Sequence, residues 1–232
     1  MGRVAAGVVA RLILQREGCI VQGFTVQVGD VVAKDWDNRA SENSVRCPDG
    51  AAAIEMERII LEAREAGDSL GGVVEVHAAG VPKGLGDPVM DKLDASLAWG
   101  LMSIGAVKGF EVGDGFASAR LRGSEMNDAM HEDGGFLTNH AGGILGGIST
   151  GEVIVVRIAV KPPSSIRIRQ KTVDIEGRPR DLEVHGRHDP CLCPRVVPVA
   201  EAMVCLTLAD ALIRQRAIQG WTPRTPPRPP LV

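Results

Sequence analysis

The chain has 232 residues, of which 44% are hydrophobic and 24% charged, and this composition is enough for one substantial hydrophobic core. A formal net charge of -3 without a basic face argues against general nucleic-acid affinity. Four Phe, three Trp and no Tyr are too few aromatic residues for base stacking or for a membrane-interface belt. The apolar runs are short or carry charges, so we expect neither a signal peptide nor a membrane partner. Five cysteines without disulfide-framework spacing favour a reducing cytoplasm.

The first predicted elements alternate between helix and strand. Residues 3–15 have the apolar spacing of a helix. Residues 19–31 alternate like a strand, and residues 30–47 form a polar loop. The apolar stripe that we expect the first helix to bury consists of Ala5, Val8, Val9 and Leu12.

A second helix and strand follow. Asp49 is the expected N-cap of a helix over residues 51–66, which ends at Gly67. Residues 72–78 form the next strand. This alternation predicts the α/β class, with helices and a sheet packed in layers.

The middle of the chain combines a helix with glycine-rich segments. Pro88 is the expected first residue of a helix that runs to Met102, before a turn at residues 105–109. Residues 139–151 contain five glycines in thirteen positions, which let the backbone approach a flat or charged ligand. A strand over residues 153–160 comes next.

The C-terminal part contains a hairpin and an apolar helix. Residues 166–184 alternate like two strands joined by a turn at residues 176–178, and we expect this hairpin at an edge. Pro198 opens a helix that is apolar on most of its circumference and therefore buried on more than one side, either as a core helix or as an oligomer-interface helix. Five prolines after Gly220 predict a disordered tail over residues 220–232. One domain over residues 1–219 is the simplest organisation.

The strongest chemical signal is a short turn that contains Arg187 and Asp189. The turn is bounded by Gly186 and Pro190, so a guanidinium that binds phosphate or carboxylate and a carboxylate that accepts a proton can face one cavity. Alternatively, the turn is solvated and its two charges neutralise each other.

A second polar group lies at the end of the strand over residues 153–160. Lys161 and the hydroxyls of Ser164 and Ser165 flank Pro162 and Pro163, which makes a rigid corner with one cation. The alternative is a solvated strand end followed by a turn.

The remaining candidates carry weaker signals. Asn139 and His140 stand at the entrance of the glycine-rich run, where His140 either hydrogen-bonds a ligand or orients the loop. His77 lies on a predicted strand and is expected to be structural. The pair Cys191 and Cys193 has no second pair, so we expect no metal site.

Five strings occur in order along nearly the whole chain: GVPKGLGDPVMDKLDA, SIGAVKGFEVGDGF, NHAGGILGGIS, KPPSS, and GRHDPC followed by P-x-A-E-A-M. Together they resemble the chorismate synthase family. The resemblance implies an incomplete version of that family's layered β-α-β sandwich. It also implies a shikimate-pathway lyase that converts 5-enolpyruvylshikimate 3-phosphate to chorismate and phosphate by 1,4-elimination.

The same resemblance implies a cofactor and an assembly. Reduced FMN is required although there is no net redox change, and it remains open whether the protein itself reduces the flavin with NADP(H) or relies on an outside reductase. A homotetramer is implied for the full-length enzyme. Family members begin with a long segment that is absent here, so we expect this chain to be the C-terminal part of a synthase and to be inactive alone. The alternative is a non-catalytic fragment that binds flavin or anions or acts as a scaffold.

Site residues follow from the resemblance position by position. Arg187 is implied to hold anionic charge beside the flavin and substrate, and Asp189 to handle the proton on flavin N5. Gly105 replaces an Asn that is frequent in relatives, so only a backbone contact is expected there; its structural alternative is a helix C-cap. The implied flavin contacts are Gly105, Ala106, Gly146, Lys161, Pro162, Pro163, Ser164, Ser165 and Arg187.

Overall fold

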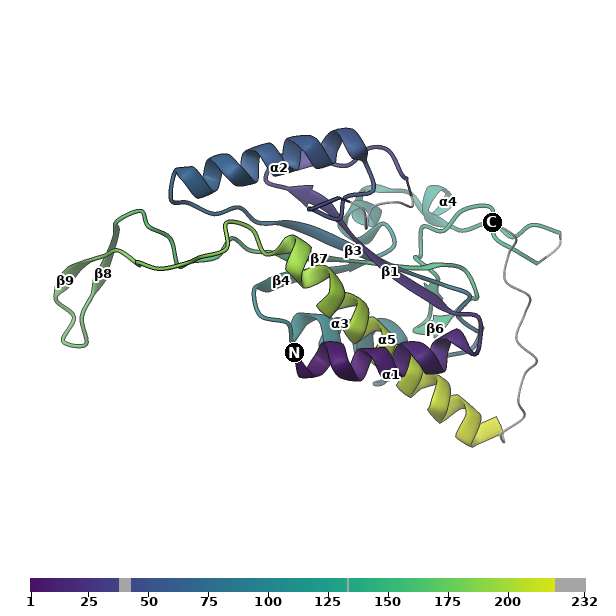
Figure 1. Ribbon diagram of the computed structural model, residues 1–232. Helices are drawn as coiled ribbons and strands as arrows, with labels where there is room; N and C mark the ends of the chain where they lie inside the picture. Colours follow the sequence, from purple (N-terminus) through teal and green to yellow (C-terminus); the bar gives the residue numbers. More distant parts are fainter. Residues whose placement is uncertain (38–42, 133, 220–232) are drawn as a thin grey trace. The chain divides into compact units, whose positions relative to one another are not determined.

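The computed structural model describes residues 1–37, 43–132 and 134–219. Its main sheet has five strands in the order β2-β1-β3-β7-β4, beside the two-stranded sheets β5-β6 and β8-β9 (Figure 1). The strands are β1 Ile20–Val28, β2 Val31–Val32, β3 Gly72–Ala79, β4 Val107–Val112, β5 Ile144–Leu145, β6 Ile148–Ser149, β7 Ile154–Val160, β8 Gln170–Val173 and β9 Pro179–Leu182. The helices are α1 Gly2–Gln15, α2 Gly50–Glu65, α3 Leu93–Met102, the 3-10 helix η2 Gly115–Arg120, α4 Gly123–Met126 and α5 Cys193–Gln219. The predicted α/β class is confirmed.

The chain divides into two compact units. Unit 1 contains residues 1–23, 75–158 and 197–232, and unit 2 contains residues 24–74 and 159–196. The boundaries fall within β1, β3 and β7, so each unit holds part of these strands. The predicted tail over residues 220–232 and part of the predicted loop lie outside the described residues. A single domain over residues 1–219 stays a prediction.

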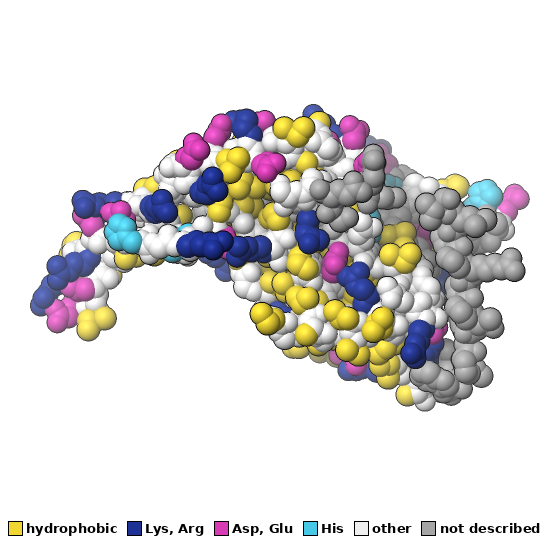
Figure 2. All heavy atoms as spheres, viewed as in Figure 1, with side chains coloured by type: hydrophobic (Ala, Val, Ile, Leu, Met, Phe, Trp, Pro, Cys, Tyr) yellow, Lys and Arg dark blue, Asp and Glu magenta, His cyan; other side chains and the backbone are white. Residues whose placement is uncertain are grey.

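In unit 1, α1 forms where predicted but buries another face. The predicted stripe is exposed: Val8, Val9 and Leu12 keep 54%, 61% and 57% of their surface accessible. The buried residues are Gly7, Ala10 and Leu14. A Cβ on Gly7 would lie 2.4 Å from the Cβ of Ala202 in α5, so the close contact between the two helices requires small residues on the buried face. Figure 2 shows many hydrophobic side chains over these helices.

Helix α5 begins at Cys193, five residues before the predicted start, and Pro198 lies inside it. Its buried residues include Val197, Ala200 and Leu208, as expected for a core helix. By length and composition alone α5 could cross a bilayer, but half of its most apolar window is buried inside the protein. Core helices of globular proteins have this property.

Helix α3 begins at Leu93, so the predicted start at Pro88 is wrong. The N–H of Asp87 donates to the carbonyl of Asp91, which closes a loop before the helix. The N–H of Leu93 donates to the carbonyl of Gly147. After the helix, residues 107–109 of the predicted turn belong to β4.

In unit 2, Asp49 caps α2 as predicted and is only 6% exposed. Its Oδ1 accepts the N–H groups of Ala51 and Ala52, and its Oδ2 accepts those of Lys34 and Asp35. These hydrogen bonds, of which the one from Ala52 has the largest effect, lower the pKa of Asp49 to about 2. One carboxylate therefore fixes both the start of α2 and the loop after β2.

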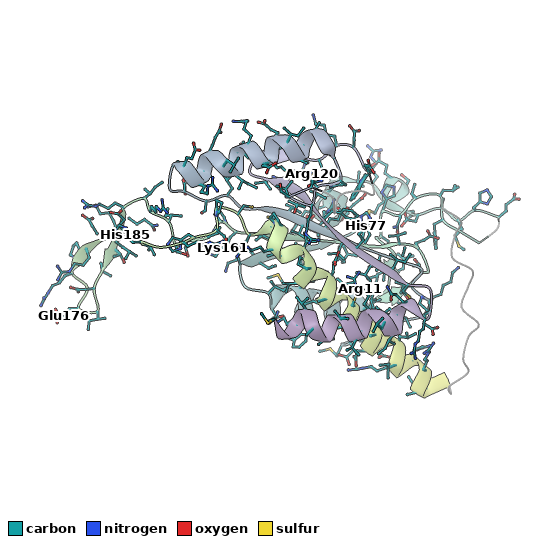
Figure 3. The ribbon with its side chains drawn as sticks, in the orientation of Figure 1. Arg11, His77, Arg120, Lys161, Glu176 and His185 are labelled. Carbon is teal, nitrogen blue, oxygen red and sulfur yellow. The ribbon has the colours of Figure 1, made fainter. Side chains whose placement is uncertain are left out.

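The C-terminal hairpin of unit 2 has the predicted turn. Gly177 adopts φ 77°, and Val173 pairs with Pro179. The hairpin forms a sheet of its own and not an edge of the main sheet. In Figure 3, Glu176 marks the tip of this hairpin.

Candidate functional site

The glycine-rich run of unit 1 folds into the β5–β6 hairpin. Ile144 pairs with Ser149 and Leu145 with Ile148, which leaves Gly146 and Gly147 as a two-residue loop. Their φ values are 60° and 85°, as the left-handed hairpin turn requires. A Cβ on Gly146 would have no heavy atom within 4 Å, so the Gly146 backbone is open to a ligand. Tight packing therefore does not explain the glycine at position 146.

At the entrance of this run, Asn139 organises the loop. Its Nδ2 donates to the carbonyl of Val153 at 2.8 Å, and its Oδ1 accepts the N–H of Gly143 at 2.7 Å. Both polar ends of the amide are thus used by the backbone. This contact pattern favours a structural role for Asn139.

His140 is held by two carboxylates. Its Nδ1 lies 2.7 Å from Oδ2 of Asp114, and its backbone N–H donates to Asp128. Burial opposes ionisation of Asp128, but hydrogen bonds from the Ala141 N–H, the Thr138 hydroxyl and the His140 N–H outweigh it and lower the Asp128 pKa. The contact with Asp114 fixes the orientation of the His140 ring and engages its Nδ1 atom.

Gly105 and Ala106 form the turn between α3 and β4. Ala106 has φ 72°, whereas the helix C-cap is Ser103. A Cβ on Gly105 would have no heavy atom within 4 Å. Gly105 is therefore not the C-cap, and the Gly105 peptide is exposed next to an Ala in a conformation that L residues rarely adopt.

Lys161 stands at the end of β7 in unit 2 (Figure 3). Its Nζ has one long contact, 3.4 Å to the carbonyl of Pro162. The following corner is anchored because Ser69 Oγ donates to the carbonyl of Pro163 at 2.7 Å. Ser164 is exposed, and Ser165 lines a small cavity of about 30 Å³.

Asp189 is paired, but not with Arg187. Its Oδ2 lies 2.7 Å from Nη1 of Arg195, in the first turn of α5. Arg187 is exposed and has no ion pair with any described residue. The alternative in which Arg187 and Asp189 neutralise each other is therefore wrong. The N–H of Leu70 donates to the carbonyl of Pro190 at 2.7 Å, which holds the turn against the segment just before β3.

The Arg187 turn lines a cavity of about 590 Å³ in unit 2. The structure therefore brings Arg187, His188 and Asp189 to one cavity, and the smaller cavity next to it is lined by Ser165 and Asp189. Sequence reasoning missed two further residues of the larger cavity, Arg64 and Arg167. Unit 1 holds the other candidate residues, namely Gly105, Ala106, Gly146 and His140.

Sequence reasoning also missed Arg195. The predicted helix starts at Pro198, whereas α5 starts at Cys193, which places Arg195 in its first turn, six residues after Asp189. The five cysteines are all buried free thiols. A hydrogen bond with Cys191 and, to a smaller extent, burial raise the pKa of Cys193. Within the described residues there is no cluster of three or more His, Cys, Asp or Glu side chains that could hold a metal ion.

The chain matches known proteins over most of its length. The chorismate synthase family profile covers residues 1–213. A chorismate synthase of Chloroflexus aggregans is 53% identical over 97% of this chain and 63% of its own length, and one of Chloroflexus aurantiacus is 55% identical over 97% and 64%. A relative from Methanothermobacter thermautotrophicus is 54% identical over 92% of this chain and 60% of its own length.

A solved structure described as the crystal structure of chorismate synthase matches with a TM-score of 0.77 and 32% identity, over 92% of this chain and 62% of that one. The fold and the sequence thus define an α/β protein with the architecture of these relatives. The chain is a member of the chorismate synthase family, and the resemblance seen in its motifs is confirmed. It spans about 63% of the length of the Chloroflexus aggregans relative.

Proposed function

We propose that this chain is part of a chorismate synthase, which converts 5-enolpyruvylshikimate 3-phosphate to chorismate and phosphate in the shikimate pathway. The observation that carries this proposal is the match of 97% of the chain to chorismate synthases at 53% and 55% identity. We propose reduced FMN as the cofactor, in a cytoplasmic enzyme that forms a homotetramer.

Each unit, taken by itself, has features that support flavin binding. Gly105 and Gly146 expose backbone without a neighbouring atom where a side chain would stand. Lys161 and Arg187 are cations without an ion pair among the described residues, so both remain able to bind an anionic group. When bound, reduced flavin supplies an electron-rich ring that assists the departure of phosphate.

The chain's own residues have distinct tasks in this proposal. Arg187 and Lys161 hold negative charge and orient the ligand. Arg195 fixes Oδ2 of Asp189 at 2.7 Å. Oδ1 of Asp189 has no hydrogen bond within the described residues. In this proposal it is the atom that accepts the proton from flavin N5. Arg195 is thus a positioning residue for the base.

The chain covers 63% of the Chloroflexus aggregans synthase, and we propose that turnover requires groups from the remainder of that length. Removing members of a catalytic unit abolishes most of the activity of the others. Apolar side chains that remain exposed, such as Trp99 at 79% and Val9 at 61%, support contacts with further protein, either that remainder or other subunits.

The test is an anaerobic assay with reduced FMN and 5-enolpyruvylshikimate 3-phosphate. It compares the chain with a chimera that adds the unmatched part of the Chloroflexus aggregans enzyme. We expect turnover by the chimera and none by the chain. In the chimera, Asp189→Asn should lower kcat by about 10² to 10⁴ while flavin affinity changes only a few-fold, because Asn keeps the shape but loses the basic oxygen.

Arg178→Ala, at the exposed hairpin tip, is the control and should leave kcat unchanged. A chimera without turnover would contradict the proposed activity. Full turnover by the chain alone would show that no further segment is needed. An Asp189→Asn chimera as active as its parent would make Asp189 purely structural.

A further inference from the structure

We propose that Arg64, Arg167 and Arg187 form a binding site for a phosphate group in unit 2. All three line the cavity of about 590 Å³, together with His188. The resemblance to chorismate synthases assigns only Arg187 to a ligand. The proposal goes beyond the proposed function because Arg64 and Arg167 bind phosphate whether or not flavin is the ligand that carries it.

The three guanidinium groups are free to bind an anion. Within the described residues, none of them has an ion pair or a side-chain hydrogen bond. Two other arginines of unit 2 are paired: Arg58 bonds Glu55 and Glu62, and Arg195 bonds Asp189. Three exposed arginines without an ion pair among the described residues line a single cavity, so their positive charge is available to an external anion.

The acidic groups nearby do not neutralise this charge. Asp189 lines the cavity, but its Oδ2 is already bonded to Arg195. Asp68 lines the smaller neighbouring cavity, where its Oδ1 accepts the N–H of Ser69. The larger cavity is lined by three arginines and one acidic residue, and that acid is itself paired. The local field therefore favours an anion.

His188 gives an independent indication. Its Nε2 is a buried atom with no hydrogen-bond partner, and the residue lines both cavities. A buried polar atom without a partner is unfavourable, and an oxygen of a bound ligand would satisfy it. The histidine and the arginines thus point to the same kind of ligand, an oxygen-rich anion.

The backbone holds Arg64 and Arg167 together. Arg64 is in the last turn of α2, which ends before Gly67. The N–H of Arg167 donates to the carbonyl of Gly67 at 2.9 Å. A Cβ on Gly67 would lie 3.0 Å from the Cβ of Arg167, so the two segments are in close contact. Figure 2 shows several basic side chains near this end of α2 and the base of the hairpin.

The number of donors favours phosphate over carboxylate. Each guanidinium offers five N–H groups in a planar fork, and three of them with an imidazole exceed what two carboxylate oxygens can accept. A phosphate monoester presents three strong acceptor oxygens and up to two negative charges. The ligand is therefore inorganic phosphate or a phosphate monoester, such as the phosphate of a flavin mononucleotide or of a phosphorylated hydroxy acid.

The test is equilibrium dialysis of the full chain against radiolabelled inorganic phosphate. We expect saturable binding, and we expect Arg64→Ala and Arg167→Ala each to weaken it by about tenfold or more, the size of a lost charged hydrogen bond. Arg58→Ala removes the same charge from the same helix but lies outside the cavity, so it should change binding by less than about twofold. Circular dichroism of each variant checks folding.

Arg64→Lys and Arg167→Lys give a second readout, because Lys keeps the charge but loses the fork and should retain part of the affinity. Competition separates the sources: displacement by FMN but not by riboflavin assigns the flavin phosphate, and displacement by shikimate 3-phosphate alone assigns a substrate phosphate. Absence of saturable phosphate binding, or equal binding by the parent and both Ala variants, would overturn the site. Neither result depends on turnover, so a failure of the phosphate site can be distinguished from a failure of the proposed activity.

Discussion

Replacing Asp49 by Asn tests how one carboxylate holds two segments of unit 2. Asn is generally as good an N-cap as Asp. At Asp49, however, both oxygens accept two backbone N–H groups each, from Ala51 and Ala52 and from Lys34 and Asp35. The amide of Asn keeps one acceptor and turns the other into a donor. Two N–H groups then lose their partner and face an NH₂ group.

Two arguments give the size of the effect. Loss of two hydrogen bonds to a charged acceptor, with partial replacement by water at exposed Lys34 and Asp35, costs about 2 kcal/mol. A pKa lowered from 3.8 to about 2 corresponds to a similar value, roughly 2 kcal/mol, before any reduction for solvent screening. We therefore expect Asp49→Asn to lower the free energy of unfolding by about 1 to 2 kcal/mol at pH 7.

The pH dependence follows from the direction of this shift. Because the folded-state pKa is lower than the unfolded one, the contribution of Asp49 is complete above about pH 4 and is lost as the pH falls toward about 2. The difference between the parent and the variant should shrink over the same interval. Urea unfolding followed by circular dichroism at pH 7 and pH 3 measures it.

The control is Asp210→Asn, an exposed carboxylate that pairs with Arg214 one turn away on α5, which should cost less than about 0.5 kcal/mol. If Asp49→Asn is no more destabilising than this control at pH 7, the double role of the carboxylate is refuted. A difference that does not decrease at low pH would refute the charge argument alone.

Three further measurements address other parts of the protein. Gly7→Ala should destabilise the chain by about 1 to 3 kcal/mol because its Cβ would meet Ala202, whereas Gly2→Ala, with no atom within 4 Å, should be neutral or slightly stabilising in the same urea experiment. Lys161→Ala should weaken FMN binding by about tenfold without changing the unfolding midpoint, with Lys171→Ala as its control; equal affinities in a flavin titration would remove Lys161 from the site. Burial, with smaller effects of Glu17 and Cys205, raises the pKa of Cys19 to about 11. Iodoacetamide at pH 8 should therefore label Cys19 only after unfolding, and rapid labelling of the native protein would contradict its burial.

Local rules of sequence were sufficient for several elements. The N-cap at Asp49 and the hairpin turn at Gly177 depend on residues within a few positions of each other, and both are confirmed. The predicted start of α5 at Pro198 is wrong because the helix begins at Cys193 and continues through this proline.

Contacts between distant residues could not be predicted in this way. The buried face of α1 is set by Gly7 against Ala202, so the rule that the larger apolar residues face inward failed. Arg64 and Arg167 line the same cavity because the segment just after α2 contacts the segment after β7. Similarly, the sequence motifs pointed to Arg187 and Asp189. They did not reveal Arg195, which bonds Asp189 because α5 begins at Cys193.

The contact between α1 and α5 also sets a time order for biosynthesis. Arg11 and Glu201, which form an ion pair at 2.8 Å between these helices, are separated by 190 positions in the chain. At roughly 5 to 20 residues per second, the ribosome needs about 10 to 40 s to add the partner of the first helix. During that interval Gly7, Ala10 and Leu14 have no α5 to cover them. The contact between α1 and α5 therefore forms only after Glu201 has been synthesised, and unit 1 completes its folding late.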